Sequence, residues 1–255
     1  MESIDRLADR AFGQTRGRLV RLPDDRPVVF IGDVHGDLDA ARRVLETFPQ
    51  PEYNLVFLGD LVDRGPDSDG VLRAVAEAKL RADRSVHLLM GNHEAWAVQP
   101  FRPADFWEHL GIETSRRLAD ALRILPFAAW HPAGLLAVHG APPDLPTLDA
   151  INGVEPGTKS WRAMTWGDLS QARGARPLAP IRPVFDRAAF EARTDRLGAR
   201  VVVRSHQPFA PQYQFDDRCL TLFTSSAYGN GPRQVALLSP GYPVRTAGDL
   251  ELIEI

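Results

Sequence analysis

The sequence has a single cysteine, Cys219, among its 255 residues. An intrachain disulfide framework is therefore excluded, and one thiol suits a reducing compartment. Cys219 opens the apolar run 219–223, and no phosphate-binding thiolate loop surrounds it. We expect this cysteine to be a buried strand residue without a catalytic role.

Long apolar runs are also missing. No stretch of about 18 apolar residues occurs, so no transmembrane helix is expected. The segment Met1–Asp5 is polar and acidic and lacks the apolar core of a signal peptide. These features predict a cytoplasmic protein that has no membrane as a partner.

Basic charge is not in excess. The chain has 30 Lys and Arg against 33 Asp and Glu, which gives a formal net charge of −3 at pH 7. A general nucleic-acid binder needs a basic surface, so nucleic acid is not an expected partner. A locally basic pocket for an anion is still compatible with this charge. The content of 44% hydrophobic and 25% charged residues is ordinary for a soluble globular protein.

Strands and helices alternate in the first half of the chain. Continuous apolar runs predict buried strands over 27–31, 54–58 and 85–90. Helical spacing of apolar residues predicts helices over 37–48, over 69–82 and from near Glu94. This alternation is typical of βαβ units and of a sheet with parallel pairs.

The second half has a different pattern. Strands are predicted over 127–130 and 135–138, near 200–204, and over 219–224, 234–238 and 243–255. A helix is predicted over 186–197 with Asp186 as its N-cap, after a Pro- and Gly-rich loop with short helices over 141–183. We interpret the tail as a β-meander. The whole chain, 1–255, is predicted to form one α/β domain after an N-terminal lead-in over 1–26, with two mixed β-sheets packed as a sandwich and flanked by helices.

Three predicted strands end in polar motifs of the same kind. They read Gly-Asp-Val-His-Gly over 32–36, Gly-Asp-Leu-Val-Asp-Arg-Gly over 59–65 and Gly-Asn-His-Glu over 91–94. In open α/β sheets, ligands bind in the crevice beyond the carboxyl ends of the strands. The glycines allow sharp turns and a close approach of the backbone to a ligand.

Two later histidines, His139 and His206, also follow predicted strands. With the motifs they complete a set of oxygen and nitrogen ligands: Asp33, His35, Asp60, Asn92, His139 and His206. A mixture without sulfur favours an open site for two divalent ions over a closed structural zinc site. Asp60 could bridge the two ions, which together could hold a hydroxide and clamp a phosphoryl oxygen.

Each of these residues taken alone has a simpler interpretation. Asp33 or Asp60 could cap a helix, and Asp63 and Arg64 could form a surface ion pair. His139 could be a hydrogen-bonded core histidine. All of these simpler interpretations would have to hold together to exclude a common site.

The three motifs, in this order, resemble the signature of the phosphoprotein phosphatase (serine/threonine protein phosphatase) branch of the calcineurin-like metallophosphoesterases. Four later segments are similar to further blocks of that family: 135–140, 166–168, 203–207 and 221–229. The similarity extends from about residue 28 to about residue 240. It implies the calcineurin-like fold and phosphomonoester hydrolysis by a hydroxide that bridges two divalent metal ions, without a phosphoenzyme.

The resemblance also implies a role for each ligand-type residue. One metal would be held by Asp60 with Asp33, His35 and His206, and the other by Asp60 with Asn92 and His139. Manganese is the expected metal, with iron or zinc as alternatives.

The same resemblance assigns the catalytic residues. Arg64 would bind the phosphate, and His93, held by Asp63, would be the general acid that protonates the leaving alkoxide. A second phosphate-binding arginine is expected between Asp168 and the helix at 186, and we choose Arg182, with Arg176 and Arg173 as alternatives. Asn92, Asp168 and Tyr228 would complete the phosphate and substrate pocket.

The expected substrate is a phosphoserine or phosphothreonine of a phosphoprotein or phosphopeptide. One alternative is a dinucleoside polyphosphate hydrolase, although Asp63 argues against it because the symmetrical hydrolases typically lack that aspartate. Another is a phosphotyrosine phosphatase, and a remote one is an inactive phosphate-binding scaffold. The chain departs from the eukaryotic members of the family at 140–143, 226–227 and Gly229, which lie at the expected pocket rim, so substrate choice stays open.

Overall fold

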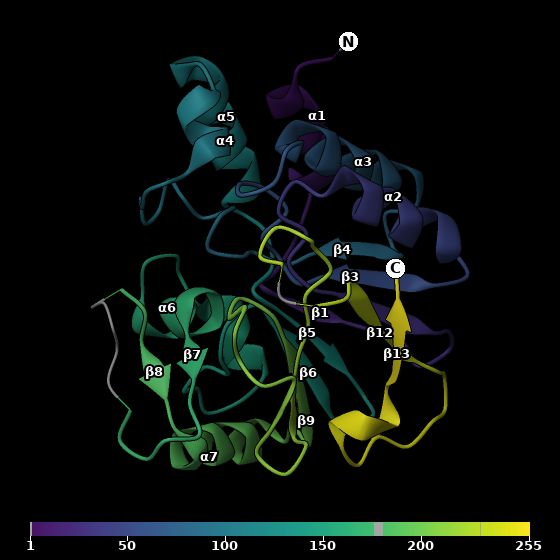
Figure 1. The fold of residues 1–255 in the computed structure, drawn as a ribbon, viewed down its shortest axis with the longest axis vertical. Helices are drawn as coiled ribbons and strands as arrows, with labels where there is room; N and C mark the ends of the chain where they lie inside the picture. Colours follow the sequence, from purple (N-terminus) through teal and green to yellow (C-terminus); the bar gives the residue numbers. More distant parts are fainter. Residues whose placement is uncertain (1, 176–180, 230) are drawn as a thin grey trace.

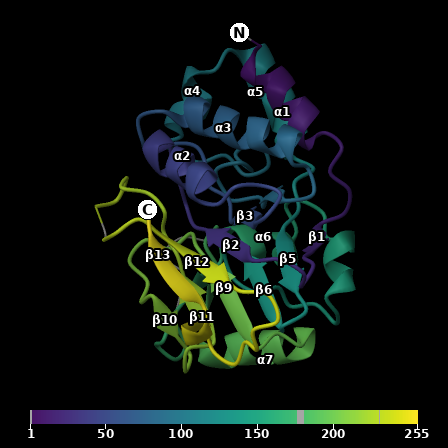
Figure 2. The same ribbon diagram turned by 90° about the vertical axis from the view of Figure 1, so that its right-hand side faces the viewer.

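The computed structural model describes residues 2–175, 181–229 and 231–255. Two mixed β-sheets lie face to face at its centre, and helices cover their outer faces (Figures 1 and 2). The predicted sandwich of two mixed sheets is therefore confirmed. The prediction of a single domain is untested and stays a prediction.

The first sheet is five-stranded, in the order β13-β12-β2-β3-β4. Its strands are β2 (Val28–Ile31), β3 (Asn54–Phe57), β4 (Val86–Leu88), β12 (Gln234–Leu238) and β13 (Glu251–Glu254). Strands β2, β3 and β4 are parallel, as the alternating pattern predicts, whereas β12 is antiparallel to both β2 and β13.

The second sheet is six-stranded, in the order β1-β5-β6-β9-β11-β10. Its strands are β1 (Leu19–Arg21), β5 (Ala128–His131), β6 (Leu135–Val138), β9 (Val201–Arg204), β10 (Tyr213–Gln214) and β11 (Cys219–Thr221). A separate two-stranded ribbon pairs β7 (Asp168–Leu169) with β8 (Val184–Phe185).

Helices cover both outer faces. Above the first sheet in Figure 1 lie α1 (Ile4–Phe12), α2 (Leu38–Thr47), α3 (Ser68–Arg81), α4 (Asp105–His109) and α5 (Ile112–Leu122). The lower half contains α6 (Lys159–Trp166) and α7 (Arg187–Leu197), and single 3₁₀ turns lie at Asp149–Gly153 and Ala247–Asp249. Asp186 caps α7 as predicted, since its side chain accepts from the backbone N–H of Ala189. Of the helices described, none is both long and apolar enough to cross a membrane.

The continuous apolar runs are explained by burial on both faces of the strands. In β2, the side chains of Val28 and Phe30 face the other sheet, whereas Val29 and Ile31 pack under the helices. Strands covered on both sides lose the alternation of polar and apolar residues. Because β2, β3 and β4 are parallel, their carboxyl ends lie at one edge of the sandwich.

Three predicted elements are wrong. The helix expected from Glu94 is a series of turns over 92–98, because the Glu94 carboxylate is turned inward to accept backbone N–H groups. The tail is not a meander, since β9 is parallel to both β6 and β11 and β12 belongs to the other sheet. In the segment 243–255, only β13 is a strand. The lead-in also contains a strand, β1, that was not predicted.

Candidate active site

The motif loops, 32–36, 59–65 and 91–94, follow β2, β3 and β4 at one edge of the first sheet. Several non-glycine residues in or beside these loops lie in the left-handed region, as does a separate run at 215–217. Positive φ angles of 45°, 55°, 69°, 69° and 72° occur at His35, Asp60, Asp63, Arg64 and His206. Such residues cost about 1–3 kcal/mol each and persist only where surrounding structure imposes them, which is frequent at functional sites.

Glu94 imposes much of this geometry. Its buried carboxylate accepts from the backbone N–H groups of Asp60 at 2.7 Å, Leu61 at 2.8 Å and Gly91 at 3.0 Å. A Cβ atom at Gly91 would overlap the Asp60 carboxylate, so only glycine allows this approach. The sequence analysis assigned no role to Glu94, although its position at the end of the third motif was a signal.

The second sheet adds a matching support for Asp33. The Ser205 hydroxyl donates to Asp33 Oδ1 at 2.5 Å, and the backbone N–H of Asp33 donates to that hydroxyl oxygen at 2.8 Å. An isolated parallel bridge between Asp33 and Phe223 joins the sheets at this point. The site therefore lies where the two sheets meet, and Ser205 was not predicted to take part in it.

One candidate ligand group consists of Asp60, His139 and His206, with Asn92 beside them. The Nε2 atom of His139 lies 3.3 Å from Asp60 Oδ2, 3.1 Å from Nδ1 of His206 and 3.2 Å from Oδ1 of Asn92. The other ring nitrogen of His139 faces the Leu58 carbonyl at 3.1 Å. A carbonyl partner at Nδ1 leaves the Nε2 lone pair facing the oxygen atoms, which is the usual orientation of a metal-bound histidine.

A second ligand group surrounds His35. Its Nδ1 lies 2.8 Å from the Val62 carbonyl, so the proton resides there and Nε2 presents a lone pair to two carboxylates. That Nε2 atom lies 3.6 Å from Asp33 Oδ2 and 3.7 Å from Asp60 Oδ2. Asp60 thus faces both groups, as a bridging carboxylate would.

The distribution of ligands differs from the expected one at His206. The sequence analysis grouped His206 with Asp33 and His35, but the structure places it beside His139. The left-handed turn at His206 directs the imidazole toward the His139 side of Asp60. In the structure, Asp60 therefore has Asp33 and His35 on one side and Asn92, His139 and His206 on the other.

The electrostatics of these buried groups fit cations. Burial raises the pKa of Asp60 to about 8. Burial also raises the pKa of Asp33, to about 7, and the nearby charge of Asp60 contributes to that rise. Burial lowers the pKa values of His35, His139 and His206, which keeps the imidazoles neutral. His206 also has a buried Nε2 atom without a hydrogen-bond partner among the described residues. Neutral imidazoles around buried carboxylates are the donor set that divalent ions require.

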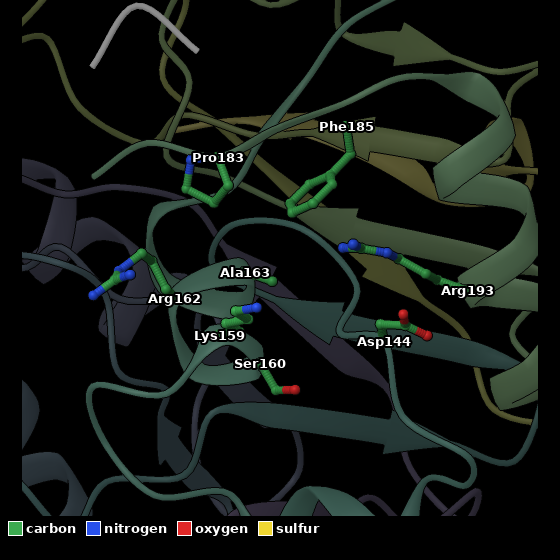
Figure 3. Close-up of a pocket in the computed structure, with 8 residues that line it drawn as sticks. All are labelled: Asp144, Lys159, Ser160, Arg162, Ala163, Pro183, Phe185 and Arg193. Carbon is green, nitrogen blue, oxygen red and sulfur yellow. The ribbon is translucent and has the colours of Figure 1, made fainter. Parts of the chain in front are cut away.

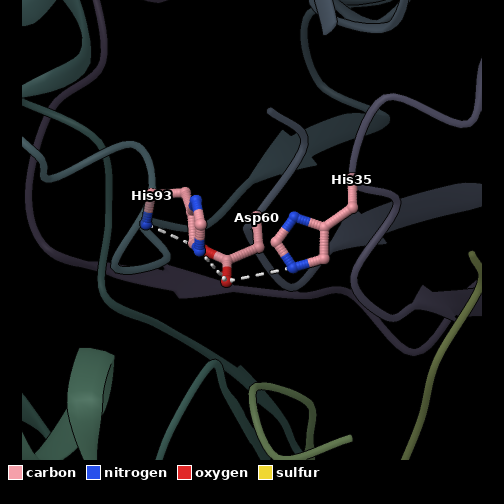
Figure 4. Close-up of side chains that lie close together, drawn as sticks. All are labelled: His35, Asp60 and His93. Atoms are coloured by element: carbon pink, nitrogen blue, oxygen red, sulfur yellow. Dashed lines mark hydrogen bonds and ion pairs between the residues drawn. The ribbon is translucent and has the colours of Figure 1, made fainter. Parts of the chain in front are cut away.

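His93 is held by Asp63, as the resemblance implied. Its Nδ1 lies 2.6 Å from Asp63 Oδ2, and Asp63 Oδ1 accepts from the backbone N–H of Phe106 at 2.7 Å. Its Nε2 lies 3.9 Å from Asp60 Oδ2, and ligand-type atoms of His35, Asp60 and His93 lie within 4.8 Å of one another (Figure 4). By position alone, His93 could therefore be a proton donor or a ligand.

A cavity of about 440 Å³ opens over this cluster. All residues expected to bind phosphate or substrate line it: Arg64, Asn92, Asp168, Arg182 and Tyr228. The Arg182 guanidinium donates to the Asp168 carboxylate at 2.8 and 3.1 Å, which directs it into the cavity.

Of the other two candidate arginines, only Arg173 lies in the part of the chain that the structure describes. Arg173 is exposed and does not line the cavity, and Arg176 lies outside the described residues.

Three aromatic side chains that line the cavity, Phe101, Trp166 and Phe209, were not predicted to do so. Phe101 lies edge-on to His93 at 4.6 Å between ring centroids and to Trp166 at 5.3 Å, and Phe209 stands at the rim with 82% of its surface exposed. Trp166 belongs to a quoted family segment, whereas Phe101 and Phe209 lie outside any motif that could have indicated them.

Comparison with known proteins supports a single family. A model described as calcineurin-like phosphoesterase matches residues 26–209. The serine/threonine-protein phosphatase PP1-delta of Caenorhabditis elegans is 27% identical over 81% of this chain and 72% of its own length. Another C. elegans protein, C27B7.6, named as a candidate serine/threonine-protein phosphatase, is 26% identical over 79% of this chain. The chain spans 48% of the length of that second relative.

A solved structure is similar over nearly the whole chain. It is a protein serine/threonine phosphatase from Saccharomyces cerevisiae with similarity to human phosphatase PP5. The TM-score is 0.78 at 22% identity, over 99% of this chain and 88% of the other. At that identity the likeness supports the fold alone.

Proposed function

Because the chain belongs to the calcineurin-like phosphoesterase family, we propose that it is a serine/threonine protein phosphatase. The family is metal-dependent, so the chain is a metal-dependent phosphoesterase. The finer assignment depends chiefly on one observation. Two arginines and His93, which Asp63 holds, face a single cavity above the carboxylate and imidazole cluster.

Two divalent ions fit the cluster. Asp60 with Asp33 and His35 would hold one, and Asp60 with Asn92, His139 and His206 would hold the other. When bound, such ions polarise a phosphoryl oxygen and make water a stronger nucleophile. The oxygen and nitrogen donors suit manganese, iron or zinc, and manganese is our choice.

The arginines would bind and orient the phosphate group. Each guanidinium can donate two parallel hydrogen bonds to phosphate oxygens, so Arg64 and Arg182 together can fix the group above Asp60. Asp168 keeps Arg182 in place through two hydrogen bonds. Tyr228 lies at the same wall, with its hydroxyl 3.4 Å from His35 Nε2.

His93 would supply the proton that the leaving alkoxide needs. Asp63 holds Nδ1 of the imidazole, so Nε2 is the atom that faces the cavity. A proton placed at Nε2 can pass to a serine or threonine oxygen as the phosphorus–oxygen bond breaks.

A phosphotyrosine is the second candidate substrate, and one observation favours it. Phe101, Trp166 and Phe209 give the cavity an aromatic wall that could pack against an aryl ester. The curated relatives of this chain are named as serine/threonine-protein phosphatases, which favours phosphoserine and phosphothreonine instead. A cytoplasmic location, expected because the sequence shows neither a signal-like segment nor a long apolar run, also stays a proposal.

A substrate panel tests the proposal. The manganese-loaded protein should be assayed with phosphoseryl, phosphothreonyl and phosphotyrosyl peptides of matched sequence, and with diadenosine tetraphosphate. We expect the phosphoseryl or phosphothreonyl peptide to give the highest kcat/KM. Preference for the phosphotyrosyl peptide would select the second candidate, and preference for the dinucleotide would contradict both.

A further inference from the structure

A second cavity, of about 410 Å³, lies between α6 and α7 (Figure 3). We call it the α6–α7 pocket, and its walls include Asp144, Lys159, Ser160, Arg162, Phe185 and Arg193. It is separate from the active site but adjoins it in the chain. Arg182 lines the active-site cavity, and the next residue, Pro183, lines the α6–α7 pocket.

Arg193 is fixed in position on the α7 side of this pocket. Its guanidinium carbon lies 3.7 Å from the centroid of the Phe185 ring, and its Nη1 atom donates to the Pro142 carbonyl at 3.0 Å. A guanidinium has five N–H donors. No other partner of this side chain is found in the described ranges, so most of its donors are free while their direction is already set.

Lys159 and Ser160 face the pocket from the first turn of α6. Figure 3 shows the Lys159 ammonium and the Arg193 guanidinium entering the pocket from opposite walls. Within the part of the chain that the structure describes, neither the Lys159 ammonium nor the Ser160 hydroxyl has a hydrogen-bond or ion-pair partner. Arg162 adds a third cation to the wall, and its Nε atom is buried without a partner.

The pocket has an unbalanced positive charge. Asp144 is the acidic residue of the wall, and its carboxylate already forms an ion pair with Arg196, which does not line the pocket. Burial lowers the pKa of Arg193, an effect that Asp144 opposes. The Arg162 and Arg193 guanidinium groups are partly buried and have unused donors, so an anion would stabilise this arrangement.

We propose that the α6–α7 pocket binds an organic phosphate monoester. Lys159, Ser160 and Arg193 would donate to the phosphate oxygens from different directions, and Phe185 with Pro183 would contact the apolar part of the ligand. The phosphate could belong to a free metabolite or to a second phosphorylated side chain of a protein substrate. This inference does not rest on the proposed reaction, since it concerns binding at a separate site.

Calorimetric titration of the manganese-loaded protein with phenylphosphonate, which resists hydrolysis, tests the proposal. We expect two equivalents to bind per chain. Lys159→Met and Arg193→Met should each weaken one equivalent by at least about tenfold, the change that loss of about 1.4 kcal/mol produces. Inhibition of p-nitrophenyl phosphate turnover by phenylphosphonate, which reports on the active site, should be unchanged in Lys159→Met.

Arg116→Met is the matched control, because it removes a positive charge from an exposed helix far from the pocket wall. It should bind both equivalents as the wild type does. Lys159 is exposed, so its substitution does not threaten folding even if Arg193→Met does. If Lys159→Met leaves every bound equivalent unchanged, whether one or two are found, the proposal is overturned.

A second arm distinguishes the two sources of phosphate, and this arm alone rests on the proposed function. If the ligand is part of the substrate, Lys159→Met should raise KM for a doubly phosphorylated peptide and leave KM for the singly phosphorylated one unchanged. If the ligand is free, both KM values should be unchanged while phenylphosphonate binding is weakened. Either result supports the phosphate site, whereas a protein without peptide turnover but with two binding equivalents would contradict only the proposed reaction.

Discussion

The motif loops and the wall formed by Trp166, Asp168 and Arg182 contribute to the same cavity in different ways. Residues of the motif loops are almost entirely buried, with Asp33 and Asp60 only 1% and 2% exposed. On the opposite wall, the side chains of Asp168 and Arg182 are 17% and 33% exposed. The loops are fixed by hydrogen bonds to buried backbone groups, whereas the Arg182 and Asp168 side chains of the wall are held by the ion pair between them, on the β7–β8 ribbon.

We infer from this difference that the loops bind ions and the wall binds substrate. Ions need ligands at fixed distances, and buried loops braced by Glu94 and Ser205 provide that rigidity. A substrate needs to enter and leave, and a partly exposed wall permits it. Substitutions in the motif loops should therefore affect ion binding and the chemical step, and substitutions in the wall should affect substrate binding.

Asp60→Asn should have the largest effect. Asp60 faces both ligand groups, so loss of its charge should weaken both ions and lower kcat by about 10³-fold or more. Turnover, metal content and circular dichroism should be measured together on the purified variant. A folded variant with near-normal turnover would show that Asp60 does not bridge.

The His93→Asn substitution tests whether His93 is a proton donor or a metal ligand. Protonation by a positioned side chain is typically worth about 10²–10⁴-fold, and serine alkoxide needs it far more than nitrophenolate. We expect kcat for a phosphoseryl peptide to fall by that range and kcat for p-nitrophenyl phosphate to fall much less. Asp63→Asn should show the same bias more weakly.

Metal content distinguishes the two roles of His93. Both variants should retain two ions, because neither residue is a proposed ligand. If His93→Asn loses an ion, then His93 is a ligand beside His35, and the acid role is withdrawn. Equal loss on both substrates with two ions present would also exclude the acid role.

Arg182→Ala, in the partly exposed wall, should weaken phosphate binding. Hydrogen bonds to charged groups contribute about 1.5–3 kcal/mol, which corresponds to roughly a 10- to 150-fold weaker inhibition by free phosphate. Arg64→Ala should behave similarly, and Arg173→Ala, an exposed arginine outside the cavity, is the control. Normal phosphate inhibition in Arg182→Ala with impairment in Arg173→Ala would reverse our choice.

Glu94→Gln should lower turnover less than loss of a proposed ligand does, through looser motif loops, and should clearly lower stability. The amide would present a donor where three backbone N–H groups need acceptors, at a cost of about 1–3 kcal/mol in the free energy of unfolding. Asp168→Asn, in the partly exposed wall, should cost less than about 1 kcal/mol. Denaturant unfolding of both variants measures the contrast, and equal destabilisation would remove the distinction between loops and wall.

Much of this arrangement could be predicted because the decisive signals are local. The apolar runs at 28–31 and 54–57 end at polar motifs, and parallel strands bring such ends to one edge. Arg182 could be chosen from its place just before the Val184–Phe185 pair. The roles of these residues are predictions that the experiments above address.

The rest depends on tertiary structure. The two- and three-residue strands β1, β7 and β8 are too short for a periodic signal. The apolar residues of β12 fit either a meander or a strand added to the other sheet. The grouping of His206 with His139 follows from a left-handed turn that no sequence pattern indicates. Glu94 looks like the start of a helix until the three N–H groups around its carboxylate are known.

The most direct test of the central claim is the number and position of bound ions. Manganese-loaded protein should be examined by metal analysis and by anomalous scattering from a crystal. The account predicts two ions per chain on either side of Asp60, one beside His35 and the other beside His139 and His206. A fully loaded protein with one ion, or with ions bound away from Asp60, would contradict it.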